Sequence, residues 1–182
     1  MLLEIQLTST EAMEQLMPGR PAARVKDPIS HSPPPTLTGT GSPNVFIGKQ
    51  PAWRGIPATQ VSALQAAKKA ADSAVQAAEA ATIAALGTPG LPAAKASEEA
   101  VKTSTGAAMS ASVMAAAAGG GDIHTCSMPL VPVTHGPGVV INGSTTVFIN
   151  RLPAARADDT VVEALGPPHQ IVAGEASVLI GG

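Results

Sequence analysis

Short runs of β-branched and aromatic residues, set beside small or polar residues, recur along this chain. Each run starts at a glycine, and they read GSPNVFIG at 41–48, GSTTVFIN at 143–150 and GEASVLIG at 174–181. Runs of Val, Ile and Phe bounded by Gly, Pro and Asn are typical of short strands that end in tight turns. The pattern therefore predicts three short strands in equivalent places of a repeated unit.

A tetrapeptide that ends in arginine recurs in register with these runs. It reads PAAR at 21–24, PAWR at 51–54 and PAAR again at 153–156. After each of the first two strand runs, the proline of the next tetrapeptide lies ten residues beyond the leading glycine of the run, at 51 after 41 and at 153 after 143. Repetition at a fixed spacing indicates a structural unit that is used more than once.

An aspartate follows the arginine by three residues in two copies, as in Arg24 to Asp27 and Arg156 to Asp159. From Arg54 the same step reaches a proline, and the aspartate that fits the pattern is Asp122. Removal of about 65 residues restores the register. The middle copy is therefore predicted to be split by an insertion.

Residues 58–118 of the insertion are rich in alanine, which is the strongest helix former. Residues 58–86 lack Gly and Pro and predict a helix of about 43 Å. GTPGLP at 87–92 ends it, with Gly87 suited to the C-terminal cap and Pro92 to the first turn of a second helix over 93–118. The insertion is predicted to be an antiparallel helical hairpin. Charges in the first helix and the Ser, Thr and Gly content of 103–121 disfavour a membrane span.

Units of about 30 residues cannot bury an apolar face alone, so three of them are expected to pack around a shared axis. The sequence thus predicts a mainly β fold: a small pseudo-threefold β-cone with an inserted Ala-rich helical hairpin. An ordinary small β-sandwich is the alternative, although a sandwich has no reason to keep a threefold register.

The composition limits what can stabilise such a fold. The chain has 182 residues, 2% aromatic residues and a single cysteine, so neither a large aromatic core nor an internal disulfide is expected. A bound metal ion is one of the few remaining ways to stabilise so small a core. The net charge of −2 offers no polycation to nucleic acid or to an anionic membrane. The first 15 residues lack the features of a signal peptide.

The histidines and the cysteine have the spacing of metal ligands. His31 lies four residues after Asp27, and Cys126 lies four after Asp122. His124 precedes Cys126 by two residues, which places both on the same side of an extended strand, and His135 follows across a loop. Zinc prefers imidazole nitrogen and thiolate sulfur in a closed tetrahedron. We favour His31, His124, Cys126 and His135 as the zinc ligands.

Two alternatives remain open for these residues. His169, in the loop of the third copy, is the substitute for His124. All of them could also be ordinary polar residues of surface loops, with Cys126 as a small buried apolar group. Catalysis is not expected, because Cys126 and His135 lack an orienting partner or oxyanion segment, and the aspartates and arginines recur as structural turn residues do.

The segments PAARVKDPISH, GSPNVFIG and DIHTC, the stretch HGPGVVINGSTTVFINRLPAAR and the closing SVLIGG resemble PAAR-repeat proteins. The resemblance covers residues 21–54 and 122–182. It implies a zinc-stabilised, non-enzymatic tip, with a zinc held by three His and one Cys near its point. Such tips cap a trimeric VgrG-type spike in contractile injection machines, notably the type VI secretion system.

The resemblance also implies a division of the chain into segments, and one position departs from the family pattern. It implies an N-terminal extension at 1–20, a first cone segment at 21–54, the hairpin insertion at 55–121 and a second cone segment at 122–182. The extension and the hairpin, which would lie off the side or base of the cone, are expected to contact an effector, an adaptor or the spike. Glu163 replaces His31 and Cys126 in the third copy, which puts a ligand from that position in doubt.

Two other functions fit the same residues. The Ala-rich insert could act on a membrane as part of an effector, or the chain could be the tip of an extracellular phage-tail-like particle. For a type VI tip the expected location is the bacterial cytoplasm before firing, and afterwards the exterior or the target cell.

Overall fold

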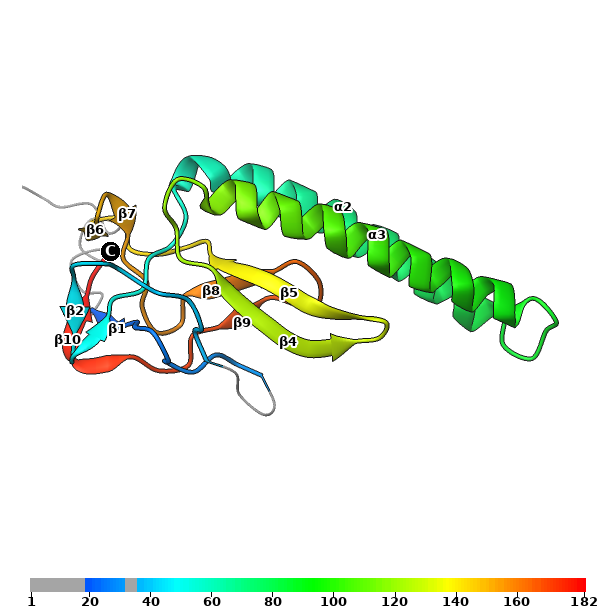
Figure 1. The fold of residues 1–182 in the computed structure, drawn as a ribbon, viewed down its shortest axis with the longest axis horizontal. Coiled ribbons are helices and arrows are strands. Elements are labelled where there is room, and N and C mark those ends of the chain that lie inside the picture. The colour runs from blue at the N-terminus through cyan, green and yellow to red at the C-terminus, as the bar shows by residue number, and fades with distance from the viewer. Residues whose placement is uncertain (1–18, 32–35) are drawn as a thin grey trace, which may run out of the picture.

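The computed structural model of the chain describes residues 19–31 and 36–182. A long helical hairpin packs along one side of a curled antiparallel sheet, and smaller strand pairs lie at one end (Figure 1). The expectation of a mainly β fold is corrected to a mixed one, because each helix has 27 residues while the longest described strand has eight. The predicted extension lies outside the described residues except for its last two positions.

The largest sheet is antiparallel, with the order β4 (His124–Leu130), β5 (Val133–Val140), β8 (Thr160–Glu163) and β9 (His169–Gln170). The remaining strands of the described residues form three antiparallel pairs: β1 (Arg20–Ala22) with β10 (Glu175–Ile180), β2 (Phe46–Ile47) with β3 (Gln50–Pro51), and β6 (Phe148–Ile149) with β7 (Leu152–Pro153). The three predicted strands are thus present as β2, β6 and β10.

The third residues of the three tetrapeptides are joined in a closed ring of backbone hydrogen bonds. Ala23 N–H donates to Ala155 C=O at 2.9 Å, Ala155 N–H to Trp53 C=O at 3.0 Å, and Trp53 N–H to Ala23 C=O at 2.9 Å. All three residues are at most 1% exposed. The recurrence of the tetrapeptide therefore has a direct structural counterpart.

Each arginine of the tetrapeptides pairs with the aspartate that the sequence assigned to it. In all three copies the arginine backbone N–H and its Nε bond one carboxylate oxygen, and Nη2 bonds the other. For the split copy, Arg54 Nη2 lies 2.7 Å from Asp122 Oδ1. The two ends of the insertion are therefore joined by the same contacts that close an uninterrupted copy.

The insertion forms the predicted hairpin. It consists of α2 (Ala58–Ala84) and α3 (Leu91–Ala117), with Gly87 in the left-handed region at φ 76° and a proline in the first turn of α3. In Figure 1 the helices run along the sheet, and their connecting loop extends beyond the β4–β5 turn. Strands β1, β2, β6 and β10 lie at the opposite end of the molecule.

Within the described residues, three clusters of buried side chains hold these parts together. The first joins the hairpin to the sheet and includes Leu64, Met109, Val113 and Val139. The second surrounds the ring of the tetrapeptides and includes Trp53, which is fully buried. The third is made of the alanine that follows each tetrapeptide proline and of one isoleucine from each short strand: Ala22, Ala52, Ala154, Ile47, Ile149 and Ile180.

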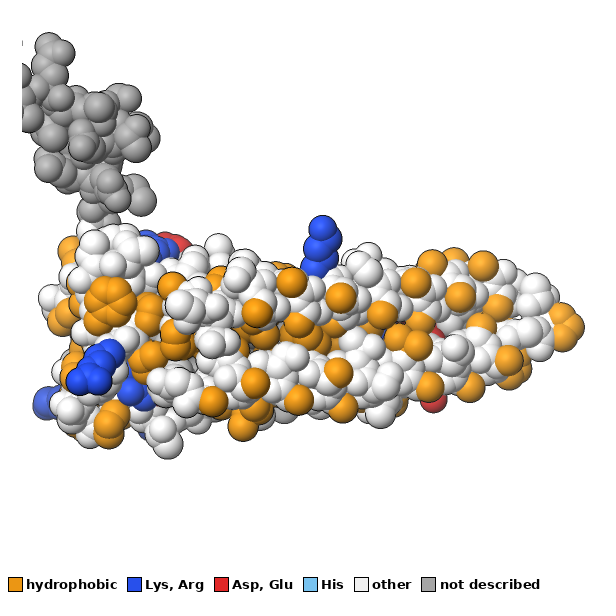
Figure 2. All heavy atoms as spheres, turned by 90° about the horizontal axis from the view of Figure 1, so that it is seen from above, with side chains coloured by type: hydrophobic (Ala, Val, Ile, Leu, Met, Phe, Trp, Pro, Cys, Tyr) orange, Lys and Arg blue, Asp and Glu red, His pale blue; other side chains and the backbone are white. Residues whose placement is uncertain are grey.

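The outer face of the hairpin carries small apolar side chains scattered along both helices and few charges (Figure 2). Neither of the two described helices is long and apolar enough to cross a membrane.

Candidate metal centre

Residues with metal-ligating side chains converge where the large sheet meets the segment after β1. β4 supplies two of them, and β5, β8, β9 and the segment after β1 supply one each. These residues are His31, His124, Cys126, His135, Glu163 and His169. Five of them are buried and His31 is half-buried, so the cluster is largely shielded from water.

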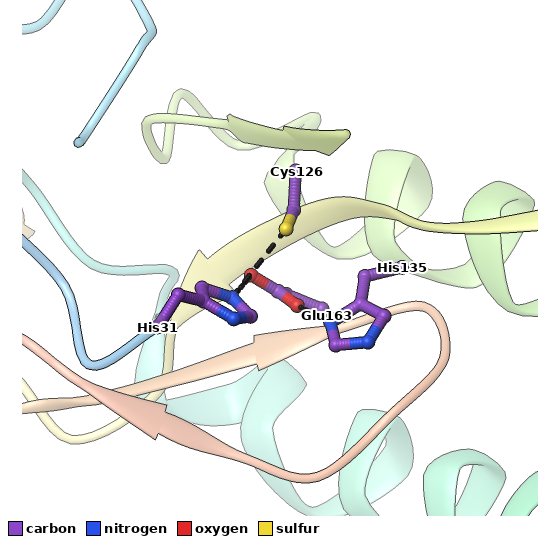
Figure 3. Close-up of side chains that lie close together, drawn as sticks. All are labelled: His31, Cys126, His135 and Glu163. Atoms are coloured by element: carbon purple, nitrogen blue, oxygen red, sulfur yellow. Dashed lines mark hydrogen bonds and ion pairs between the residues drawn. The ribbon is translucent and has the colours of Figure 1, made fainter. Parts of the chain in front are cut away.

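A tight group forms the middle of this cluster (Figure 3). His31, Cys126, His135 and Glu163 each offer one ligand atom, and these four atoms all lie within 4.8 Å of one another. Cys126 Sγ lies 3.4 Å from His31 Nε2, which in turn lies 3.0 Å from Glu163 Oε1. The donors are nitrogen, sulfur and oxygen atoms, which is the set that zinc accepts.

The carboxylate of Glu163 is the point on which the histidines converge. Its Oε1 lies 3.0 Å from His31 Nε2 and 3.4 Å from His124 Nε2. Its Oε2 lies 2.7 Å from His135 Nδ1 and 3.7 Å from His169 Nε2. Burial alone would raise the pKa of this carboxyl, but its interactions with His124, His31 and His135 outweigh burial and lower its pKa to about 2. The group is therefore an anion in the protein interior.

Two histidines present buried ring nitrogens that no described group satisfies. His124 Nε2 and His169 Nε2 lack a hydrogen-bond partner within the described ranges. His169 Nδ1 donates to Ser30 C=O at 2.9 Å, and burial lowers the pKa of His169. A neutral His169 then presents the lone pair of Nε2 to the Glu163 carboxylate, which is itself an acceptor. A cation between these two acceptors would satisfy both, so the site fits a metal ion.

Cys126 is the candidate ligand whose metal-binding form depends most on the presence of a metal ion. It is 1% exposed, and burial raises the pKa of its thiol to about 11. A thiolate is the form that binds zinc, and without a cation the thiol stays protonated at neutral pH. Zinc, when bound, would supply the charge that stabilises the Cys126 thiolate.

The structure brings all five sequence-predicted candidates around one point. The tight group nevertheless contains Glu163 where the sequence favoured His124, although His124 lies on the same buried face of β4 as Cys126. The choice of His31, His124, Cys126 and His135 as zinc ligands, with His169 as the substitute, stays a prediction.

Glu163 is the member that the sequence interpretation placed at the equivalent position but doubted as a ligand. His31, Cys126 and Glu163 each follow the aspartate of their copy by four residues. These three equivalent positions meet in the fold. Equivalence of position was therefore a better guide to the cluster than the usual preference of zinc for nitrogen and sulfur.

Comparison with known proteins gives one positive finding. Residues 130–182 match the family model of the PAAR motif. This match confirms the resemblance to PAAR-repeat proteins over the second part of the chain, while for residues 21–54 the resemblance stays a prediction. No curated protein and no solved structure matches the chain.

Proposed function

Since residues 130–182 match the PAAR motif, we propose that this chain is a PAAR-repeat protein and serves as the non-enzymatic, zinc-stabilised tip of a contractile injection machine of the type VI kind. It would cap a trimeric VgrG-type spike, one tip per trimer. The hairpin is the proposed attachment surface for an effector or adaptor, because it is an addition to the repeated unit.

The observation that carries this proposal is the closed ring of hydrogen bonds among Ala23, Trp53 and Ala155. A homotrimer presents three identical surfaces around its axis. A single chain can match such an end only if it offers similar surfaces in three directions. The ring, with one Arg–Asp pair beside each of its members, supports an approximate threefold arrangement within this chain.

The proposed docking face is formed by three exposed apolar side chains in equivalent strands. Phe46 of β2, Phe148 of β6 and Leu179 of β10 are 60%, 56% and 58% exposed. Their strands lie at the end of the molecule away from the hairpin loop (Figure 1). Burial of these side chains against a spike would stabilise the complex through the hydrophobic effect.

The candidate metal centre has a structural role in this proposal. The cluster joins the segment after β1 to three strands of the large sheet. His31, Cys126, His135 and Glu163 would hold a zinc ion by coordination, which ties these segments together. The two anions, Glu163 and a Cys126 thiolate, would balance the charge of the ion in the buried site.

The docking face can be tested with charge substitutions. We expect the double variant Phe46→Asp and Phe148→Asp of this chain to bind a purified VgrG-type spike trimer at least about tenfold more weakly than the wild type. Each change removes an apolar anchor of the kind that dominates interfaces. Val131→Asp is the matched control, since Val131 is 76% exposed in the β4–β5 turn away from the docking face. Calorimetry gives the affinity, and native mass spectrometry gives the stoichiometry.

One tip per trimer, lost in the double variant and kept in Val131→Asp, would support the proposal. Equal affinity of the double variant and the wild type would show that the spike docks elsewhere. A stoichiometry of three tips per trimer would contradict the role proposed for the ring.

A further inference from the structure

A short loop, residues 164–168, separates the candidate metal centre from the helical hairpin. It connects β8 to β9, so Glu163 precedes it directly and His169 follows it. Its middle residue, Gly166, has φ +83° and lies against the ring of His135: a Cβ at Gly166 would be 2.7 Å from His135 Cε1. The loop thus touches the cluster at both of its ends and at its middle.

The hairpin holds the same loop from the other side. Lys68 of α2 donates from Nζ to the backbone C=O of Gly166 at 2.7 Å. On α3, a Cβ at Gly106 would lie 2.9 Å from Leu165 Cδ1, so the absence of a side chain there lets Leu165 approach the helix. Each helix of the hairpin therefore contacts at least one residue of the loop.

Burial makes the Lys68 contact significant. Lys68 is 5% exposed, and its ammonium is paired with Asp72 one helical turn further on. A buried ammonium is costly unless its donors are satisfied. The Gly166 carbonyl is the acceptor that Lys68 uses outside its own helix. A displacement of the loop would leave Lys68 with a donor unsatisfied, so the position of the loop and the docking of the hairpin depend on one another.

We propose that Lys68 is a positioning residue of the metal centre, acting through Gly166 on Glu163, His135 and His169. The inference rests on the metal centre of the proposed function and extends it to the insertion. The hairpin then strengthens metal binding by holding the loop in place. By linkage, metal binding stabilises the docked hairpin by the same free energy.

The chain offers a matched pair of lysines for the test. Lys102 of α3 is 7% exposed, and its Nζ lies 2.9 Å from Glu79 Oε1 and 2.6 Å from Glu98 Oε1. All three of these residues belong to the hairpin, and none of these contacts reaches the loop. Lys68→Met and Lys102→Met each remove one buried ammonium from the hairpin, and Lys68→Met alone removes a contact to the loop.

The experiment measures Zn²⁺ affinity of the full chain by competition with a chromogenic chelator. We expect Lys68→Met to bind zinc about tenfold more weakly than the wild type, as for loss of an outer contact that orients a metal ligand. Lys102→Met should bind zinc as the wild type does. Equal affinities for the wild type and Lys68→Met would overturn the inference, as would an equal loss in both variants.

A measurement on the unaltered protein keeps the inference testable if a variant does not fold. Hydrogen exchange of the wild type is followed with zinc and after chelation. Removal of zinc should speed exchange in residues 64–72, which surround Lys68, more than in residues 78–86 toward the hairpin loop. Equal acceleration in both stretches would contradict the coupling. A wild type that binds no zinc would refute the metal centre itself, whereas docking of the tip on a spike trimer is tested separately.

Discussion

Among single residues, Glu163 determines the charge of the candidate metal centre. It is fully buried, yet its pKa is held near 2 because the surrounding histidines outweigh the effect of burial. Without a metal, this anion is what keeps four imidazole rings directed at one point. With a metal, it would be a further anionic ligand beside Cys126.

The lowered pKa of Glu163 predicts how acid affects the metal-free protein. A carboxyl whose folded-state pKa of about 2 lies below its ordinary value of 4.5 stabilises the fold fully above pH 4.5. That stabilisation is lost as the pH falls from 4.5 toward 2. We expect the free energy of unfolding in chelator to fall by up to about 1.4 kcal/mol per pH unit in this window.

The measurement is urea denaturation followed by the fluorescence of Trp53, the single tryptophan, which is fully buried. Glu163→Gln has the same shape but cannot ionise, so its stability should change much less between pH 4.5 and 2. The same pH slope in the wild type and in Glu163→Gln would show that other groups cause the acid sensitivity.

The repeated Arg–Asp pair organises the molecule at the scale of its elements. In each copy it closes the turn after the tetrapeptide, and in the middle copy it also closes the base of the hairpin insertion. The pairs differ in their other contacts. Arg24 has a second carboxylate partner in Glu175, while the further partners of Arg54 are the neutral oxygens of Asn150 and Gly41.

This difference predicts unequal costs for removal of the aspartates. Asp122→Ala leaves the buried Arg54 without a carboxylate and should lower the free energy of unfolding by about 3–5 kcal/mol. Asp27→Ala leaves Arg24 paired with Glu175, so it should cost clearly less. Denaturation of both variants in the presence of zinc measures the two costs. A larger loss for Asp27→Ala would show that the turn of the first copy, and not the base of the insertion, is the critical one.

The whole molecule combines a small aromatic content with a cluster of candidate metal ligands and a long helical hairpin. Its buried side chains are mostly Ala, Val, Ile and Leu in three separate clusters. In a chain with few large apolar side chains, a cross-link between distant segments supplies a relatively large share of the folding stability. The candidate metal centre lies where such a cross-link would join the sheet to the segment after β1.

Removal of the metal should therefore lower the stability of the whole chain. Ligand that binds only the folded state stabilises it by about 4 kcal/mol at a thousand times its dissociation constant. We expect the Tm of the wild type to fall on chelation, and the Tm of Cys126→Ala to be lower from the start and much less sensitive to chelator. Differential scanning calorimetry, with zinc content by elemental analysis, checks both. A chelator-insensitive wild type would show that the cluster is stable without a metal.

The sequence by itself determined the elements, because these depend on local chemistry. Two alanine-rich runs separated by the GTPGLP stretch specified the two helices, and glycine-bounded runs of Val, Phe and Ile specified the short strands. The spacing of Arg and Asp was enough to predict which aspartate pairs with Arg54, since a repeated turn needs the same pair at the same distance. Asp122 was assigned to Arg54 across the insertion for this reason, and the two residues are paired.

Only the tertiary structure decided which donors meet and what lies beside them. Glu163 and His169 belong to strands that pair in the large sheet, and their distance from His31 depends on the curl of that sheet. The docking of Lys68 on Gly166 joins residues 98 positions apart in the chain, and no local pattern specifies it. The physical reason is that local propensity acts between neighbours in sequence, whereas burial and coordination act between neighbours in space.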